Sequence, residues 1–159
     1  GQIGTIELKG ENIFKGYWGM EEKTKESFKD DGFFITGDLA KKDENGYFTI
    51  VGRDKDMIIS GGLNVYPKEI EDVINELPNI TESAVFGVQH DDFGEAVVAA
   101  VVTTDDKNDG SQILDYTKDK IAKYKQPKKI IFMSNLPRNS MGKVQKNKLR
   151  ENNKSLFKS

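Results

Sequence analysis

The feature that most constrains this 159-residue chain is its longest uninterrupted apolar run, Ala96–Val102. A membrane-spanning helix needs about 20 apolar residues, so this run instead has the length of one buried strand. A second strand is indicated by the alternating segment Ile3–Lys9, and a hairpin by Asn45-Gly46 between the apolar segments Phe33–Ile35 and Tyr47–Val51. These strands are interleaved with helical patterns, which predicts an α+β chain with a central mixed sheet flanked by helices.

The clearest helical pattern follows Pro67. Ile70, Val73, Ile74 and Leu77 are spaced i, i+3, i+4 and i+7, which places them on one apolar stripe of a helix. Proline suits the first helical position because its missing N–H has no intrahelical partner there. We therefore expect a helix that begins at Pro67 and packs this stripe against the sheet.

The composition removes several classes of protein. The chain has no cysteine and one histidine, His90. The first fact excludes a disulfide scaffold and a thiolate metal site, and the second argues against a histidine-rich metal centre. We therefore assign no metal ligand, and we expect a cytoplasmic protein because no segment has the pattern of a signal peptide or a membrane span.

The net charge of −2 conceals two opposed regions. Residues 1–116 hold 11 Lys/Arg and 24 Asp/Glu, whereas residues 117–159 hold 13 Lys/Arg and 2 Asp/Glu. A basic end attracts a polyanion, either nucleotide phosphates or nucleic acid, but it can equally be a solvated face that partners the acidic region. Its aromatic residues are too widely spaced to form a base-stacking platform, which argues against a nucleic-acid-binding module.

Three predicted loops combine glycine and charge more densely than a simple connector needs, and the first of them stands at the end of the predicted strand Phe33–Ile35. They are Ile35–Asp38, then Gly52–Asp56 with Ser60–Gly62 behind it, and Pro137–Lys143. Taken singly, each has an ordinary explanation: a turn, a surface ion-pair network, or a position that needs positive φ. Gly142-Lys143 suggests a phosphate loop, but Pro137 and Val144 stand where a Walker sequence has glycine and Ser/Thr.

Taken in order, these segments resemble the late motifs of the adenylate-forming superfamily, which includes acyl-CoA synthetases, luciferases and peptide-synthetase adenylation domains. The matching stretches are Gly32–Asp38, Asn45–Tyr47 with Gly52–Asp56 and Gly61–Pro67, and Pro137–Lys143. The resemblance runs from Ile3 to Arg150. It implies a C-terminal portion of such an enzyme, in which residues 1–53 end a large, β-rich AMP-binding domain and residues 54–159 form a small mobile domain.

The resemblance also implies a role for six residues. Asp38 would bind the ribose hydroxyls of ATP, Arg53 the same ribose or its phosphates, and Lys55 would be the hinge. Gly61 and Gly62 would line the tunnel for the pantetheine arm of CoA in the second step. Lys143 would be the catalytic lysine of the first step.

The implied ligands are ATP, CoA, a carboxylic acid, and Mg²⁺ bound mainly by the large N-terminal domain of the same protein. We expect the chain to be a fragment that forms no adenylate alone. The sequence of its motifs is most similar to that of malonyl-CoA synthetases. A medium- or long-chain or an aryl acyl-CoA synthetase is the alternative. The spacing from Pro137 to Gly142-Lys143 also resembles sites that protein acetyltransferases modify, so an acetyltransferase acting on Lys143 is a possible partner.

Overall fold

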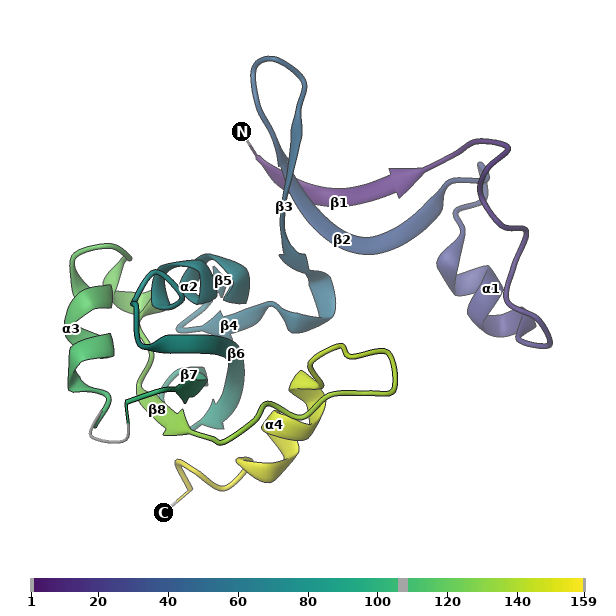
Figure 1. Ribbon diagram of the computed structural model, residues 1–159. Coiled ribbons are helices and arrows are strands. Elements are labelled where there is room, and N and C mark those ends of the chain that lie inside the picture. Colours follow the sequence, from purple (N-terminus) through teal and green to yellow (C-terminus); the bar gives the residue numbers. More distant parts are fainter. Residues whose placement is uncertain (1, 106–108, 159) are drawn as a thin grey trace. The chain divides into compact units, whose positions relative to one another are not determined.

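The computed structural model describes residues 2–105 and 109–158. The chain forms two compact units, residues 1–55 and residues 56–159 (Figure 1). Across the described ranges, no helix has both the length and the apolar character needed to cross a membrane.

The first unit is a three-stranded antiparallel sheet with one helix. Its elements are β1 (Ile3–Leu8), α1 (Glu21–Ser27), β2 (Phe34–Lys42) and β3 (Phe48–Arg53), with strand order β1-β2-β3. The predicted hairpin at Asn45-Gly46 is confirmed between β2 and β3. Its turn is closed by Asp43 and Tyr47: the Asp43 N–H donates to the Tyr47 carbonyl at 3.0 Å, and the Tyr47 N–H donates to Asp43 Oδ1 at 2.8 Å.

The second unit is a mixed sheet with helices on both faces, as predicted. Its helices are η1 (Asp54–Asp56, which begins in the first unit), α2 (Pro67–Ile74), α3 (Ser111–Lys118), η2 (Lys123–Lys125) and α4 (Lys146–Asn152). Its strands are β4 (Ile58–Ser60), β5 (Leu63–Val65), β6 (Ile80–His90), β7 (Gly94–Thr103) and β8 (Lys129–Phe132). The strand order is β5-β4-β7-β6, all antiparallel, and β8 pairs with β7 in parallel.

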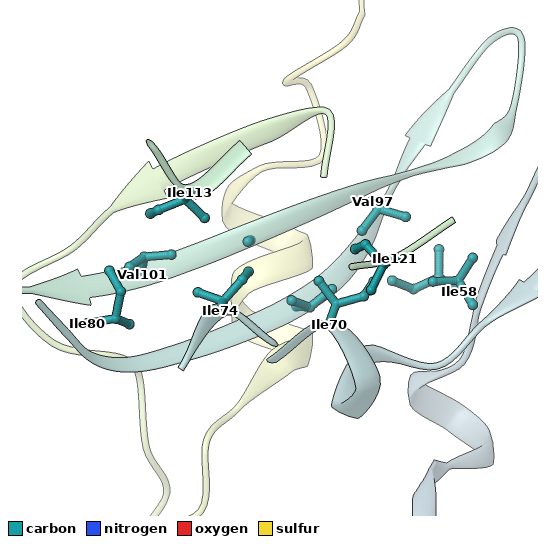
Figure 2. Close-up of a cluster of buried hydrophobic side chains, with 11 residues drawn as sticks. Ile58, Ile70, Ile74, Ile80, Val97, Val101, Ile113 and Ile121 are labelled. Atoms are coloured by element: carbon teal, nitrogen blue, oxygen red, sulfur yellow. The ribbon is translucent and has the colours of Figure 1, made fainter. Parts of the chain in front are cut away.

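The apolar run Ala96–Val102 lies in β7, at the centre of this sheet. Val97, Ala99 and Val101 face a core formed with α2 and the segment around α3, whereas Val98 and Ala100 face a second core that includes Leu149 of α4. Figure 2 shows the first core, in which Val97 and Val101 of β7 lie among isoleucines that include Ile70 and Ile74 of α2 and Ile113 of α3. Because both faces of β7 are covered, the run is continuously apolar rather than alternating. Burial of each valine stabilises the fold by roughly 1.5–3 kcal/mol.

The predicted helical stripe is confirmed in α2. Ile70 and Ile74 are fully buried, and Val73 and Leu77 pack against the same core. The helix itself ends at Ile74, and Leu77 continues its stripe from a turn in which its N–H donates to the Ile74 carbonyl at 3.2 Å. The stripe therefore spans the helix and the turn that follows it.

Candidate functional site

The segment Thr36–Asp38 is a bulge inside β2, so its prediction as a loop at a strand end is wrong. Three residues of β2 stand opposite the single residue Ile6 of β1, and pairing resumes on both sides. Gly37 has φ +72°, which glycine adopts without strain. Thr36 Oγ1 donates to the Ile6 carbonyl at 2.8 Å and accepts the Asp38 N–H at 3.0 Å. A bulge of this kind re-aims a side chain while the strand continues.

The two residues predicted to contact the nucleotide come together in the first unit. Asp38 and Arg53 are paired across β2 and β3, and Arg53 Nε lies 2.7 Å from Asp38 Oδ1. Arg53 Nη1 also donates to the carbonyl of Thr36 in the bulge, at 3.4 Å. The pair is partly exposed, so it adds at most about 1 kcal/mol to stability. Its use is geometric, because it presents a carboxylate that can accept hydroxyl hydrogen bonds beside a cation that can bind phosphate.

Lys55 is the last residue of the first unit and the middle residue of η1. The next residue, Asp56, belongs to the second unit and accepts a hydrogen bond from Arg150 of α4, with 3.0 Å between Arg150 Nη2 and Asp56 Oδ1. The first residue of the second unit, directly after Lys55, is therefore held by a hydrogen bond to α4 of the same unit.

Gly61 and Gly62 form the two-residue turn between β4 and β5. Their φ values are +58° and +77°, as a tight hairpin turn of this length requires. A Cβ atom added to either glycine would meet no atom within 4 Å, so the backbone of the turn is open to close approach by another molecule. The Gly61 N–H donates to the Phe93 carbonyl at 2.8 Å, which fixes the turn to the segment ahead of β7.

Lys143 lies in the segment between β8 and α4, and Figure 1 draws that segment as a long loop. Asn139 organises the tip: its N–H donates to the Lys143 carbonyl at 3.0 Å, and its Oδ1 accepts the N–H groups of Met141 and Lys143 at 3.0 and 2.9 Å. Gly142 has φ +77°. The Lys143 side chain is exposed and pairs with no residue that the structure describes. The backbone is therefore fixed while the ammonium group is available to a ligand.

Arg138 holds this loop in place, and its role could not be predicted from the sequence. Its Nη1 donates to the Gly142 carbonyl at 2.6 Å, and its Nη2 forms an ion pair with Glu82 of β6. Glu82 lies 56 residues away, and no local pattern connects the two. One indication of this role is present in the sequence, namely that Arg138 is a second cation within the segment Pro137–Lys143.

Among the described residues, six of the 13 Lys/Arg in the basic end, residues 117–159, form ion pairs with acidic residues from elsewhere in the chain. The ion pairs are Lys118–Asp115, Lys120–Glu76, Lys125–Glu69, Arg138–Glu82, Lys146–Glu71 and Arg150–Asp56. Burial acts to lower the pKa of Lys125, but the hydrogen bond and charge of Glu69 outweigh it, and the pKa is raised. The explanation of the basic end as a partner of the acidic region is thus favoured over a nucleic-acid surface.

Residues 69–143 match the family described as the AMP-binding enzyme C-terminal domain. This stretch includes most of the second unit and reaches Lys143. The fold of the second unit agrees with that match.

The relatives are named CoA ligases. The long-chain-fatty-acid–CoA ligase FadD13 of Mycobacterium tuberculosis is 45% identical over 148 residues, which cover 93% of this chain and 29% of the relative. The malonate–CoA ligase of Arabidopsis thaliana is 38% identical over 161 residues, covering 94% and 26%. This chain therefore spans less than a third of the length of these relatives.

Among solved structures, ATP-bound MatB from Rhodopseudomonas palustris is 58% identical, with a TM-score of 0.92 over 99% of this chain and 32% of that one. The apo form of the same MatB aligns over the same shares with a TM-score of only 0.72. The two MatB structures therefore differ from each other within the matched region.

Proposed function

We propose that this chain is the C-terminal portion of an ATP-dependent acid–CoA ligase, which makes an acyl-adenylate and then an acyl-CoA thioester. The observation that carries the proposal is Lys143, an exposed cation without a partner among the described residues, on a loop whose backbone is fixed. A cation presented in this way suits a reaction that brings two anions together.

The first step needs such a cation. A carboxylate is a poor acyl donor because its leaving group would be oxide. Its oxygen attacks the α-phosphorus of ATP, pyrophosphate leaves, and the acid becomes an acyl-adenylate with AMP as its leaving group. Lys143 would offset the charge that accumulates between carboxylate and phosphate. Asp38 would accept the ribose hydroxyl hydrogen bonds, and its partner Arg53 would contact the ribose or the phosphates.

The second step needs a different surface. The CoA thiol attacks the acyl carbon, AMP leaves, and the cation is no longer required. We propose that rotation about Lys55 withdraws Lys143 and brings in the Gly61-Gly62 turn, whose open backbone would line the path of the pantetheine arm. The difference between the two MatB structures supports a domain that takes more than one position.

A large N-terminal domain is the remaining partner in this proposal. It would supply the phosphate loop, the acyl pocket and the site of Mg²⁺, which assists the departure of pyrophosphate. The first unit carries apolar side chains that are largely exposed in this chain, namely Trp18, Tyr47, Phe48 and Ile50. We expect the large domain to cover part of this surface.

Malonate is the acid that we propose, because the motif wording resembles malonyl-CoA synthetases and a malonate–CoA ligase is among the relatives. A fatty-acid ligase is the alternative that FadD13 supports. The test is a panel of malonate, medium- and long-chain fatty acids and aryl acids offered to the full-length enzyme. Acid-dependent exchange of pyrophosphate into ATP and mass analysis of the thioester identify the substrate. Exchange with none of these acids would contradict the ligase proposal itself.

We also propose that a protein acetyltransferase can switch off the first step at Lys143. Acetylation removes the charge and keeps the bulk of the side chain. Lys143 is exposed, whereas Lys146 is held against Glu71 at 2.7 Å with only 17% of its side chain exposed. Peptide mass analysis after treatment with an acetyltransferase should therefore show more modification at Lys143 than at Lys146. Equal modification of both, or normal adenylation by the Lys143-acetylated enzyme, would rule out the switch.

A further inference from the structure

The β4–β5 hairpin pairs with β7 over a short stretch of backbone. Only one residue pair, Ser60 and Gly94, forms a regular bridge between β4 and β7. In that antiparallel register Ile59 stands opposite Glu95, and its N–H points away from β5, since Ser60 and Leu63 form the pair next to the turn. The Ile59 N–H needs an acceptor that the backbone ladder does not supply.

Glu95 supplies that acceptor with its side chain. The Ile59 N–H donates to Glu95 Oε2 at 2.8 Å. Together with the Gly61 N–H on the Phe93 carbonyl and the Ser60–Gly94 bridge, this contact places the backbone attachment of the hairpin on three consecutive residues, 93–95, in addition to the packing of Ile58 in the core. Of the three contacts to residues 93–95, only the one from Glu95 depends on a side chain.

Gly87 provides the space for that side chain. It is buried in β6, opposite Val97, and so lies diagonally across from Glu95 on the same face of the sheet. A Cβ atom at Gly87 would lie 2.5 Å from Glu95 Oε1 and 3.0 Å from Ile58 Cγ2. Glycine within a strand weakens the strand unless another group must approach closely. Here the group that approaches is the Glu95 carboxylate.

We infer that Glu95 is a positioning residue for the second half-reaction: its carboxylate, seated over Gly87, holds the backbone of β4 so that the Gly61-Gly62 turn keeps its place. The inference rests on the proposed role of that turn in the path of CoA. Glu95 touches no reacting atom in this scheme and acts through Ile59. Charge-assisted hydrogen bonds to a backbone N–H are among the stronger ones in proteins, so this contact is sufficient to order a short hairpin.

The test compares Glu95→Ala with Glu95→Gln in the full-length enzyme. Alanine removes the acceptor, whereas glutamine keeps an oxygen at the same position. Hydrogen–deuterium exchange of residues 58–62 should accelerate by on the order of ten- to a hundredfold in Glu95→Ala. Thioester formation from supplied acyl-adenylate should fall about tenfold, mainly through a higher KM for CoA, while adenylate formation stays within about twofold. Glu95→Gln should recover most of both losses.

Gly87→Ala gives an independent approach to the same contact. Its methyl group would displace the carboxylate, so this variant should reproduce the exchange and KM effects of Glu95→Ala. The double variant should be little worse than Glu95→Ala, because both changes remove one contact. Additive losses in the double variant would overturn the assignment of Gly87 as the seat of the carboxylate.

Two outcomes separate this inference from the proposed function. Unchanged exchange of residues 58–62 in Glu95→Ala overturns the positioning role and leaves the ligase proposal intact. Faster exchange with no loss of thioester formation overturns the positioning role and, with it, the proposed role of the Gly61-Gly62 turn.

Discussion

The Lys143 loop and the β4–β5 hairpin belong to the same small unit but are held in different ways. The loop is fixed by side chains: Asn139 organises its tip, and Arg138 bridges Glu82 of β6 and the carbonyl of Gly142. The hairpin is fixed by backbone contacts to residues 93–95 and by Glu95. One presents a long cationic side chain, and the other presents backbone with no side chain at the turn. The two supports share no residue, so the two half-reactions that we propose should be separable by substitution.

The largest effect that we expect comes from Lys143→Ala. Adenylate formation should fall by about two to three orders of magnitude, because the variant loses the cation aimed at the two approaching anions. Thioester formation from supplied acyl-adenylate should be largely spared. Pyrophosphate exchange measures the first step, and release of AMP from the supplied adenylate measures the second.

The matched control is Lys148→Ala, which removes another exposed lysine from the adjoining helix. It should leave both half-reactions near normal. Equal losses in both half-reactions of Lys143→Ala would show that the loop and the hairpin do not divide the chemistry between them.

Lys55→Pro tests the division of roles in a different manner, because it changes neither the Lys143 loop nor the β4–β5 hairpin directly. Proline fixes φ near −65°, a value that a 3₁₀ helix accepts. The unit should therefore fold but be restricted to one orientation, and one half-reaction, most readily thioester formation, should fall by about tenfold or more. Lys55→Ala, which keeps the backbone free to rotate, is the control. Normal overall turnover by Lys55→Pro would exclude a hinge at this position.

Much of the fold followed from local patterns. The run Ala96–Val102 predicted one buried strand, and the stripe from Ile70 to Leu77 predicted a helix that begins at Pro67. Both succeed because burial imposes a period on the sequence within one element. The hairpin at Asn45-Gly46 was also predicted correctly from local sequence, because turn geometry depends on a few adjacent residues.

The details of the candidate site depended on contacts that no local pattern records. Thr36–Asp38 was predicted as a loop because glycine and aspartate are typical of turns, yet β2 continues through it as a bulge that Ile6 of β1 stabilises. Glu95 is 36 residues from Ile59, the residue that it holds. Glycine at position 87 was uninformative until the neighbouring strand brought a carboxylate over it. Such pairs are set by strand register, which only the folded chain reveals.

A smaller effect is expected when the support of the Lys143 loop is loosened. Arg138→Ala should lower adenylate formation by about tenfold and leave thioester formation unchanged, because the cation remains but its loop is less ordered. Glu82→Gln should give a weaker version of the same loss. The comparison variant is Lys154→Ala, which removes an exposed ion pair with Glu151 at the end of α4. A loss of thioester formation in Arg138→Ala would mean that the two supports are coupled.

The smallest expected effect concerns the ion pair of Glu76 and Lys120, which lies outside the Lys143 loop and the β4–β5 hairpin. It tests whether a change in stability elsewhere in the unit leaves both half-reactions unaffected. Hydrogen bonds from Lys120 and then Tyr116 hold the pKa of Glu76 below its ordinary value. The folded state therefore binds its proton less readily than the unfolded chain. The stabilisation is fully present above the ordinary carboxyl pKa and is lost as the pH falls through the lowered one. Glu76→Gln should accordingly melt slightly below the wild type at neutral pH, with the difference vanishing in acid, and both half-reactions should be unchanged. Thermal melts across this pH range measure the effect. A difference that grows in acid would contradict the assignment, because it would place the stabilisation in the protonated carboxyl group.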